Sequence, residues 1–264
     1  MIWRRYHRAG IPEYLARHYW WAYLSRPMVW FFDHRPVLNL ILFGQYKRLM
    51  RRTLIRFFRG CRQGRVLQLT HAYGDLTPTL VEGLKGGEFH LMDIAPVQLQ
   101  AARHKLREAE RDAEALLARM NAECLAYADD SFDTVVIFFL LHELPSDVRQ
   151  RVLGETMRVL KPGGRLLTVD YGGLTRHHPL HRSALMRGIV GFLEPYLRGF
   201  WREDLRVMVA EAASGARKAI VHVEEDSVFA GFYRVTEFRM QIDAVTDMPL
   251  TPDGRSGEAV MVSG

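Results

Sequence analysis

The stretch "VLQLTHAYGDLT" (Val66–Thr77) decides the fold, because it joins a buried strand to a helix through a short loop. Its first residues are an apolar run typical of a strand covered on both faces. A helical pattern follows over residues 76–84, where Pro78 is tolerated because it falls in the first helical turn. Gly74 lies in the loop between them, and a glycine lets the backbone approach a ligand where a Cβ would collide. The stretch therefore predicts a strand, a ligand-binding loop and a helix.

Strands and helices alternate through the rest of the central region. The clearest strand is Phe132–Leu141, a continuous β-branched and aromatic run that predicts burial on both faces. The alternation favours a parallel sheet with helices on both faces, in which ligands bind beyond the carboxyl ends of the strands. The expected strands span residues 65–70, 88–93, 116–120, 132–141, 165–171, 218–223 and 228–240. The expected helices span residues 76–84, 95–108, 146–160 and 202–213.

The 264 residues fall into three regions. Residues 1–64 predict a basic, aromatic-rich helical extension, residues 65–240 a catalytic domain, and residues 241–264 a disordered tail without periodicity. With 48% apolar residues the chain can bury one large core. Only Cys61 and Cys124 are present, so neither a disulfide framework nor a thiolate metal site is supported. We expect no leader peptide, because the first ten residues lack an apolar core followed by a cleavage site.

Positive charge is concentrated in the extension. Residues 1–65 hold 14 Lys and Arg against two acidic residues, whereas the formal charge of the whole chain is only +6. On a helix over residues 46–57, one face is apolar and the other carries Lys47, Arg48, Arg51 and Arg52. With several tryptophans upstream, this pattern predicts a surface in the lipid interface. The alternative is a helical lid packed on the catalytic domain.

Two other interpretations of the charged extension are disfavoured. Its longest uncharged run, residues 36–46, is much shorter than the roughly 20 residues that a spanning helix needs. Nucleic-acid binding would explain the charge but not the tryptophans, and no recognition motif is present, so no nucleic-acid partner is expected. No pattern in the sequence predicts an oligomeric state.

An ordered set of motifs carries a family resemblance between Val66 and Asp170. The set is "VLQLTHAYGDLT", "LMDIAPVQL", "NAE" followed by "DDSFD", "LLHELP" and "RVLKPGGRLL". In this order they resemble the class I S-adenosylmethionine-dependent methyltransferases, especially those of ubiquinone and menaquinone biosynthesis. The resemblance implies an α/β, Rossmann-like class I methyltransferase fold with a mostly parallel seven-stranded sheet, preceded here by the helical extension.

The resemblance also implies a binding site for S-adenosylmethionine. Asp93 corresponds to the acid that grips both ribose hydroxyls, and Ile94 would flank the adenine. Asn121 and Ala122 stand where the family has an Asp-Ala pair at the adenine amino edge. Gly74 would let the loop backbone approach the ligand. The alternative for Asp93 is an ordinary N-cap of the helix over residues 95–108.

The loop departs from the family pattern in its first half. Gln68 replaces the acid that organises the methionine end of the cofactor, and His71 and Tyr73 add bulk where the loop wraps the ligand. A neutral amide does not attract a cationic ammonium group as a carboxylate does. We therefore include Gln68, His71 and Tyr73 among the cofactor-binding residues and expect an altered pose of the methionine part.

This altered loop resembles that of the RquA family of rhodoquinone biosynthesis proteins. The resemblance implies an enzyme that converts ubiquinone to rhodoquinone by replacing a ring methoxy group with an amino group. It also implies that S-adenosylmethionine donates the nitrogen and that Mn²⁺ is the metal. An uncharged residue at position 68 would suit this reaction, because a nearby carboxylate favours the ammonium form, which has no lone pair. The membrane quinone as substrate implies a cytoplasmic enzyme peripheral to the inner membrane.

Candidate metal ligands and catalytic residues follow the predicted strands. Manganese prefers carboxylate, water and imidazole ligands, and we assign His71, Asp75 and Glu143 to it. His142, Glu143 and Tyr171 are the candidate catalytic residues, with His142 or Glu143 as proton acceptor. The alternative for Asp75 is a helix cap, and for His142 and Glu143 it is a polar strand end that caps the next helix.

Two other functions remain open from the sequence. The first is a methyltransferase of a quinone or prenylated phenol with a degenerate loop, which would form S-adenosylhomocysteine and a methylated product. A third interpretation is a non-catalytic, membrane-bound module with a decayed cofactor site. The presence of Gly74 and Asp93 argues against decay, although a fold alone never fixes function.

Overall fold

The computed structural model describes residues 3–60, 63–174, 178–183, 188, 190–191 and 193–241. The predicted tail at residues 242–264 lies outside this part of the chain. Among the described helices, none combines the length and the apolar character that crossing a bilayer requires.

A seven-stranded sheet in the order β3-β2-β1-β4-β5-β7-β6 forms the centre of the molecule. The first five strands pair in parallel, and β7 runs antiparallel to both β5 and β6. The strand order reverses between β1 and β4, which is where such sheets bind ligands. The predicted mostly parallel sheet of seven strands is therefore confirmed. The strands are β1 (Arg65–Leu69), β2 (Glu88–Asp93), β3 (Ala115–Arg119), β4 (Phe132–Phe138), β5 (Leu160–Tyr171), β6 (Ile220–Val228) and β7 (Tyr233–Met240).

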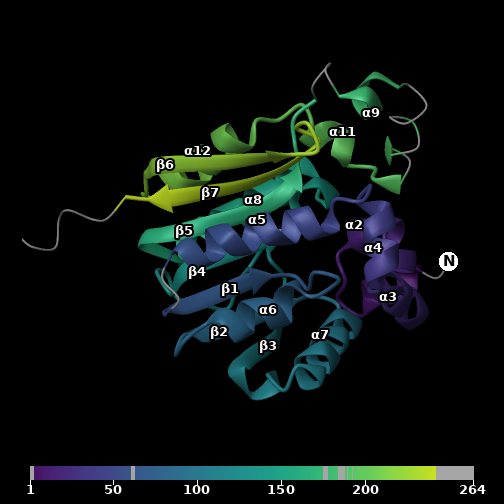
Figure 1. The fold of residues 1–264 in the computed structure, drawn as a ribbon, viewed down its shortest axis with the longest axis horizontal. Coiled ribbons are helices and arrows are strands. Elements are labelled where there is room, and N and C mark those ends of the chain that lie inside the picture. Colours follow the sequence, from purple (N-terminus) through teal and green to yellow (C-terminus); the bar gives the residue numbers. More distant parts are fainter. Residues whose placement is uncertain are drawn as a thin grey trace, which may run out of the picture.

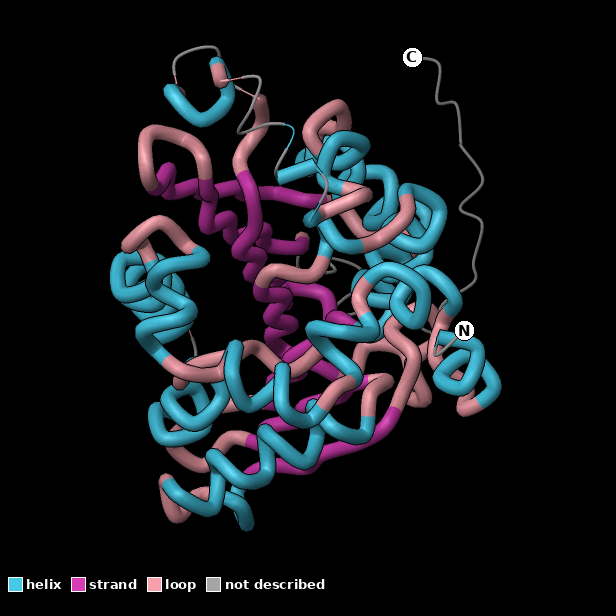
Figure 2. Tube along the Cα trace, turned by 90° about the vertical axis from the view of Figure 1, so that its right-hand side faces the viewer, coloured by secondary structure: helices cyan, strands magenta, loops and turns pink. Residues whose placement is uncertain are grey.

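Helices cover both faces of the sheet (Figures 1 and 2). One face carries α5 (Tyr46–Arg59), α6 (Leu76–Gly83) and α7 (Pro96–Glu108), which contact one another in that order. The other face carries α8 (Ser146–Val159) and α12 (Leu205–Gly215). Short 3-10 turns are η2 (Asp112–Glu114) and η3 (Leu141–Glu143), and two short helices are α9 (Pro179–Arg182) and α11 (Leu197–Phe200).

The N-terminal extension is helical, and its part before α5 lies at the end of the sheet toward which the parallel strands run (Figure 1). Pro27 and Pro36 fall in the first turns of two of its helices, where the missing N–H has no helical partner to lose. Before α5 it consists of α1 (Trp3–Arg8), α2 (Glu13–His18), the π-helical turn η1 (Trp20–Leu24), α3 (Arg26–Phe32) and α4 (Arg35–Ile41).

Several strand boundaries differ from the prediction. Strand β6 spans Ile220–Val228 rather than residues 218–223, and β7 begins at Tyr233 rather than at residue 228. The strand expected to reach Leu141 ends at Phe138, because Phe139 adopts a left-handed backbone conformation with φ of 54° and the chain then turns into η3. In contrast, β5 begins at Leu160 rather than Arg165, and it runs through the "KPGG" sequence with a register shift against β4. A continuous apolar pattern does not reveal where the backbone leaves a sheet.

Helix α5 is packed on the sheet rather than exposed. Leu49, Met50 and Phe57 belong to the main hydrophobic core, and α5 contacts β5, β6 and β7. The interpretation that this apolar face lies in lipid is wrong, because the sheet covers it. For α5, the alternative of packing on the catalytic domain is the observed one.

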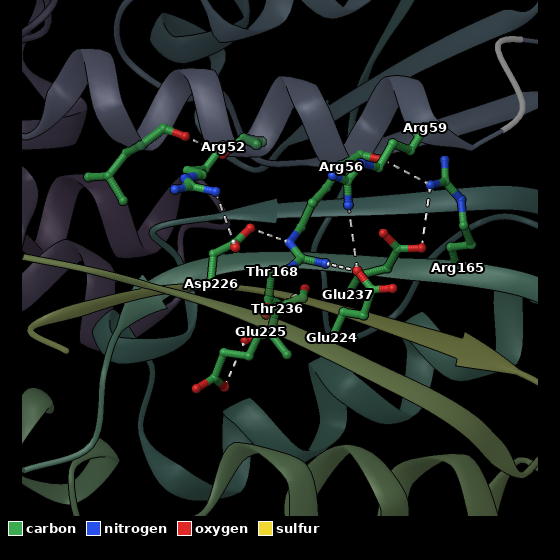
Figure 3. Close-up of polar contacts among 12 residues, drawn as sticks. Arg52, Arg56, Arg59, Arg165, Thr168, Glu224, Glu225, Asp226, Thr236 and Glu237 are labelled. Carbon is green, nitrogen blue, oxygen red and sulfur yellow. Dashed lines mark hydrogen bonds and ion pairs between the residues drawn. The ribbon is translucent and has the colours of Figure 1, made fainter. Parts of the chain in front are cut away.

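Buried arginines fix α5 to the three strands beneath it (Figure 3). Arg56 pairs with Glu224 and Asp226 of β6, each at 2.7 Å. Arg165 of β5 donates to the carbonyl oxygens of Arg56 and Phe57 at the end of α5, at 3.3 and 3.2 Å. Its Nη1 also lies 3.6 Å from Oε1 of Glu237. Buried charges are stable only with such partners, so these contacts determine where α5 lies.

Replacement of the buried cation should destabilise the fold more than replacement of an exposed one. Arg165→Met leaves two α5 carbonyls and Glu237, which is only 2% exposed, without this partner. We expect the free energy of unfolding, measured by urea denaturation, to fall by about 3 kcal/mol. The control is Arg59→Met, because Arg59 is 64% exposed and lies 3.9 Å from Glu224. It should lower the same free energy by less than about 1 kcal/mol, and equal losses would contradict the assignment.

Candidate functional site

A cavity of about 270 Å³ lies at the carboxyl ends of the parallel strands. Its walls come from the β1–α6 loop, from the ends of β2, β4 and β5, and from the N-terminal extension. Figure 2 looks onto this end of the sheet, where helices and loops lie in front of the strands. Nine of the predicted site residues line this cavity: His71, Tyr73, Asp93, Ile94, Asn121, Ala122, His142, Glu143 and Tyr171. Gln68, Gly74 and Asp75 are not among its lining residues.

Asp93 ends β2 and presents a buried carboxylate at the cavity. Its Oδ2 accepts from the backbone N–H of His71 at 2.9 Å, and its Oδ1 accepts from that of Ala95 at 2.8 Å. Burial raises the pKa of Asp93 to about 6, although these backbone donors act in the opposite direction. The residue at the N-cap of α7 is Ala95, so the interpretation of Asp93 as that cap does not hold.

His71 is the polar residue of the loop that faces the cavity without a partner. It is 8% exposed, and neither ring nitrogen has a hydrogen-bond partner in the described part of the chain. Burial lowers its pKa to about 4, so the ring is neutral at physiological pH. A neutral imidazole offers one donor and one acceptor. Because buried polar groups are nearly always satisfied, this ring is suited to contact a bound ligand.

Tyr73 joins the loop to the N-terminal extension. Its hydroxyl donates to the carbonyl of Ala22 at 2.9 Å and accepts from Nε2 of Gln98, also at 2.9 Å. Its ring stacks on Tyr23 and on Phe32, with centroid distances of 5.8 and 6.3 Å. The large side chain of Tyr73, which distinguishes this loop, therefore holds η1 and α3 over the cavity.

Gly74 serves protein packing, whereas the sequence predicted close approach of a ligand. Its φ is +85°, and a Cβ would collide with the hydroxyl of Tyr46 and contact Leu38. Its N–H donates to Oδ1 of Asp33 at 2.8 Å, and its carbonyl accepts from Lys105. These contacts again tie the loop to the extension.

Gln68 lies beneath the loop, and its amide is fully used there. Nε2 donates to the carbonyl of Thr70 at 2.9 Å, and Oε1 accepts from Oγ1 of Thr77 at 3.1 Å. Since Gln68 is buried outside the cavity lining, it supports the loop and leaves no carboxylate from β1 at the ligand. The prediction that Gln68 contacts the cofactor directly does not agree with this geometry.

A cluster of ionisable side chains occupies the cavity wall at the ends of β4 and β5. Nδ1 of His142 lies 2.8 Å from Oδ1 of Asp170. Its Nε2 lies 3.9 Å from Oε1 of Glu143 and 3.8 Å from Oε2 of Glu194. Two tyrosines of the extension complete the cluster: the hydroxyl of Tyr23 donates to Glu143, and that of Tyr19 donates to Glu194 at 3.1 Å.

Burial and neighbouring charges raise the pKa values of three groups in this cluster. Burial alone would lower the pKa of His142, but the carboxylate of Asp170 and the two glutamates raise it to about 9. Burial raises the pKa of Glu143 to about 8, with His142 acting in the opposite direction. Burial also raises the pKa of Glu194. Groups that titrate near pH 7 are suited to proton transfer.

The same three side chains can hold a divalent cation. Ligand atoms of His142, Glu143 and Glu194 all lie within 4.8 Å of one another. Imidazole and carboxylate match the ligand preference of manganese, and the contact of His142 with Asp170 resembles the carboxylate–histidine arrangement of metal sites. The residues therefore fit such an ion.

The predicted ligand set of His71, Asp75 and Glu143 is not brought together. Asp75 pairs with Arg35 at 2.6 Å outside the cavity, and the cluster includes only Glu143 of the three. Asp75 precedes α6 but its side chain makes no cap hydrogen bond. Sequence reasoning missed Glu194, because the sequence of residues 177–195 has no periodicity that could have indicated its place.

Comparison with known proteins places the central region among methyltransferase domains. Residues 66–164 match the family described as "Methyltransferase domain". A ubiquinone/menaquinone biosynthesis C-methyltransferase UbiE from Pectobacterium carotovorum is 36% identical over 134 residues, which cover 50% of this chain and 52% of that protein. The chain thus spans about half the length of the curated relatives that it matches.

Solved structures share the fold at low sequence identity. A SAM-dependent methyltransferase from Aquifex aeolicus has a TM-score of 0.56 and 17% identity, covering 83% of this chain and 99% of that one. The [4+2]-cyclase SpnF has the same TM-score and identity, covering 83% of this chain and 97% of that one. The chain therefore has the class I methyltransferase fold, as predicted, and this fold also occurs in a protein described as a cyclase.

Two glycine substitutions should separate backbone strain from the packing of the extension on the loop. Gly74 and Gly86 both have positive φ, but a Cβ at Gly86 would meet nothing within 4 Å. We expect Gly86→Ala to lower the free energy of unfolding by about 1 kcal/mol. Gly74→Ala should lower it by roughly 2 kcal/mol more, because Tyr46 and Leu38 must move. Urea denaturation measures both, and equal losses would show that the loop does not need this close contact.

Proposed function

We propose that this chain, half of which is similar to a ubiquinone/menaquinone biosynthesis C-methyltransferase, binds S-adenosylmethionine in the cavity and modifies a quinone. Support for the cofactor comes from Asp93, whose carboxylate is suited to the two ribose hydroxyls. Ile94 and Asn121 line the same cavity and would flank the adenine. The cavity also lies where the strand order reverses, as ligand sites in such sheets do.

We further propose that the reaction is amination, which replaces a ring methoxy group of ubiquinone with an amino group and gives rhodoquinone. One observation carries this choice. An acid–base cluster of His142, Glu143 and Glu194 lines the cavity, while the loop beside it presents the neutral His71 and no carboxylate. A methyl donor needs no proton acceptor for its own amine, whereas an amino donor does.

The loop would bind the donor nitrogen, and the cluster would accept its proton. An amine attacks only when it is unprotonated, and a carboxylate beside it would favour the ammonium form. His71 can hydrogen-bond the amine without supplying such a charge. Glu143, which accepts from Tyr23, can take up the proton that the nitrogen loses.

The bonds balance without an external oxidant or reductant. The nitrogen forms a bond to the ring carbon, the carbon–oxygen bond breaks, and the methoxy group leaves as methanol with a proton relayed by the cluster. The bond between nitrogen and the α-carbon then breaks as a β-proton is removed. The ring keeps the amino group, and the donor leaves as a 2,3-unsaturated sulfonium. Each proton taken up by the cluster is returned, so the base is regenerated.

A manganese ion fits this proposal. His142, Glu143 and Glu194 would hold it, and when bound it would lower the pKa of the amine and polarise a quinone oxygen. A carboxylate has two oxygens, so Glu143 can bind a cation with one and accept a proton with the other. Asp170 keeps the ring of His142 in place through its contact with Nδ1.

Methyl transfer to a quinone or prenylated phenol is the second candidate. It is favoured by the relatives that match about half of this chain, which are described as C-methyltransferases. A non-catalytic binding module is the third, and the acid–base cluster in the cavity argues against it.

Isotope labelling separates these functions in one experiment. The purified protein is incubated with a short-tail ubiquinone, Mn²⁺ and S-adenosylmethionine that carries ¹⁵N at the α-amine and ¹³C at the methyl group. Amination places ¹⁵N in the quinone with loss of methoxy, and methyl transfer places ¹³C there. Glu143→Gln should lower amination by at least about a hundredfold, whereas the exposed Glu82→Gln should not. Label in neither position would reject both enzymatic proposals.

Cofactor affinity should depend on the ionisation of Asp93. Its pKa of about 6 means that the carboxylate is present above this pH and is lost below it. We expect the Kd for S-adenosylhomocysteine to rise about tenfold between pH 7 and pH 5, as measured by calorimetry. Asp93→Asn should bind weakly with little dependence on pH. A wild-type affinity that is constant over this range would contradict the ribose role.

A further inference from the structure

An exposed apolar surface covers the outside of the N-terminal extension. Trp30 and Leu40 are 68% and 78% exposed, and three other large apolar side chains of η1, α3 and α4 are also exposed. These elements contact one another in sequence, with η1 on α3 and α3 on α4. We call this the α3–α4 surface, and it consists of Trp21, Trp30, Phe31, Leu40 and Ile41. Such a cluster indicates an interaction site, because single exposed apolar residues are normally scattered.

Two residues of this surface also belong to the cavity wall. Trp21 and Ile41 are exposed and also line the cavity. Leu38 and Leu42, on the inner side of α4, line it as well and are buried. Helix α4 therefore carries both side chains that line the cavity and side chains that face outward, so an apolar ligand that enters beside it would meet Leu38, Ile41 and Leu42.

A cationic hollow adjoins the other side of α4. It has a volume of about 680 Å³, and its walls include Arg35 and Asn39 of α4 and Lys47 and Arg51 of α5. Asp75 also lines it and pairs with Arg35. Lys47 and Arg51 are exposed and form no ion pair with the described residues. The hollow therefore offers two uncompensated cations beside an apolar surface.

We propose that the α3–α4 surface and the cationic hollow together bind an anionic lipid bilayer. The apolar side chains lie at the acyl boundary, and Lys47 and Arg51 contact headgroup phosphates. Membrane binding itself does not rest on the proposed function. Only the passage of a quinone through this surface into the cavity does.

A bilayer fits this surface better than a second copy of the chain. In a symmetric dimer, each α3–α4 surface would meet the same patch of its partner, so their flanking cations would lie near one another. Like charges across an interface are unfavourable, whereas an anionic bilayer complements them. The extension as a whole carries 14 Lys and Arg over residues 1–65.

Vesicle flotation of the full chain tests the proposal with paired variants. The vesicles consist of phosphatidylcholine alone or of phosphatidylcholine with phosphatidylglycerol. We expect wild-type protein to float with the anionic vesicles, and Trp30→Gln/Leu40→Gln to lower partitioning at least about tenfold. The control Leu116→Gln/Val207→Gln removes two apolar side chains that are exposed elsewhere and should float like wild type.

A second pair of variants tests the contribution of the cations to membrane binding. Lys47→Gln/Arg51→Gln should lower partitioning into anionic vesicles about thirtyfold and leave partitioning into phosphatidylcholine unchanged. The control Lys85→Gln/Arg103→Gln removes two exposed cations from another part of the surface and should have no such effect. Circular dichroism confirms that each variant is folded.

Three outcomes would overturn the proposal. They are wild-type protein that does not float, test variants that float like their controls, and a dimer in solution that Trp30→Gln/Leu40→Gln converts to monomer. Turnover of a short-tail quinone in detergent separates this proposal from the proposed function. Turnover in detergent by a protein that does not float would reject only the proposed membrane-binding surface. Flotation of a protein without turnover would reject only the proposed function.

Discussion

The carboxylate of Asp170 determines the geometry of the candidate site. Asp170 is the buried residue before the last one of β5, and its Oδ2 accepts from the backbone N–H groups of Leu141 and His142 at 3.0 and 3.4 Å. Its Oδ1 lies 2.8 Å from Nδ1 of His142. One side chain thereby fixes both the turn that follows β4 and the ring that this turn carries. Because a buried carboxylate is stable only when its lone pairs are used, the turn, the ring and the strand end form one unit.

The loop after β1 and the N-terminal extension form a second unit. Tyr73 and Gly74 of this loop both contact the extension. The hydroxyl of Tyr73 donates to Ala22, and Gly74 donates to Asp33 and packs closely against Tyr46. In turn the extension supplies Tyr19 and Tyr23 to the glutamates of the cluster. The cavity is therefore completed by residues far apart in the sequence, and the loop's unusual side chains are explained first by attachment of the extension.

The sequence predicted the sheet and much of the site because both follow from local patterns. The run Phe132–Leu141 indicated the central strand, and the order of motifs placed Asp93, Asn121 and His142 at one edge. The roles of Gln68 and Asp75 were not predictable in this way. Whether a side chain points into a cavity depends on backbone direction, such as the φ of 65° at Thr70, and on partners from distant elements such as Arg35. Glu194 reaches the cluster only through tertiary packing.

Charge balance links the cluster to the ions that it can hold. Glu143 and Glu194 face one another across Nε2 of His142 in a cavity whose other walls are mostly apolar and aromatic. Burial and the neighbouring carboxylate of Glu194 raise the pKa of Glu143 to about 8, so a proton on Glu143 reduces the charge of this buried pair. A divalent cation provides the same compensation and would displace the proton of Glu143, which leaves the other oxygen of this carboxylate able to accept a proton. The chemistry of the site therefore depends on these three side chains more than on the fold that surrounds them.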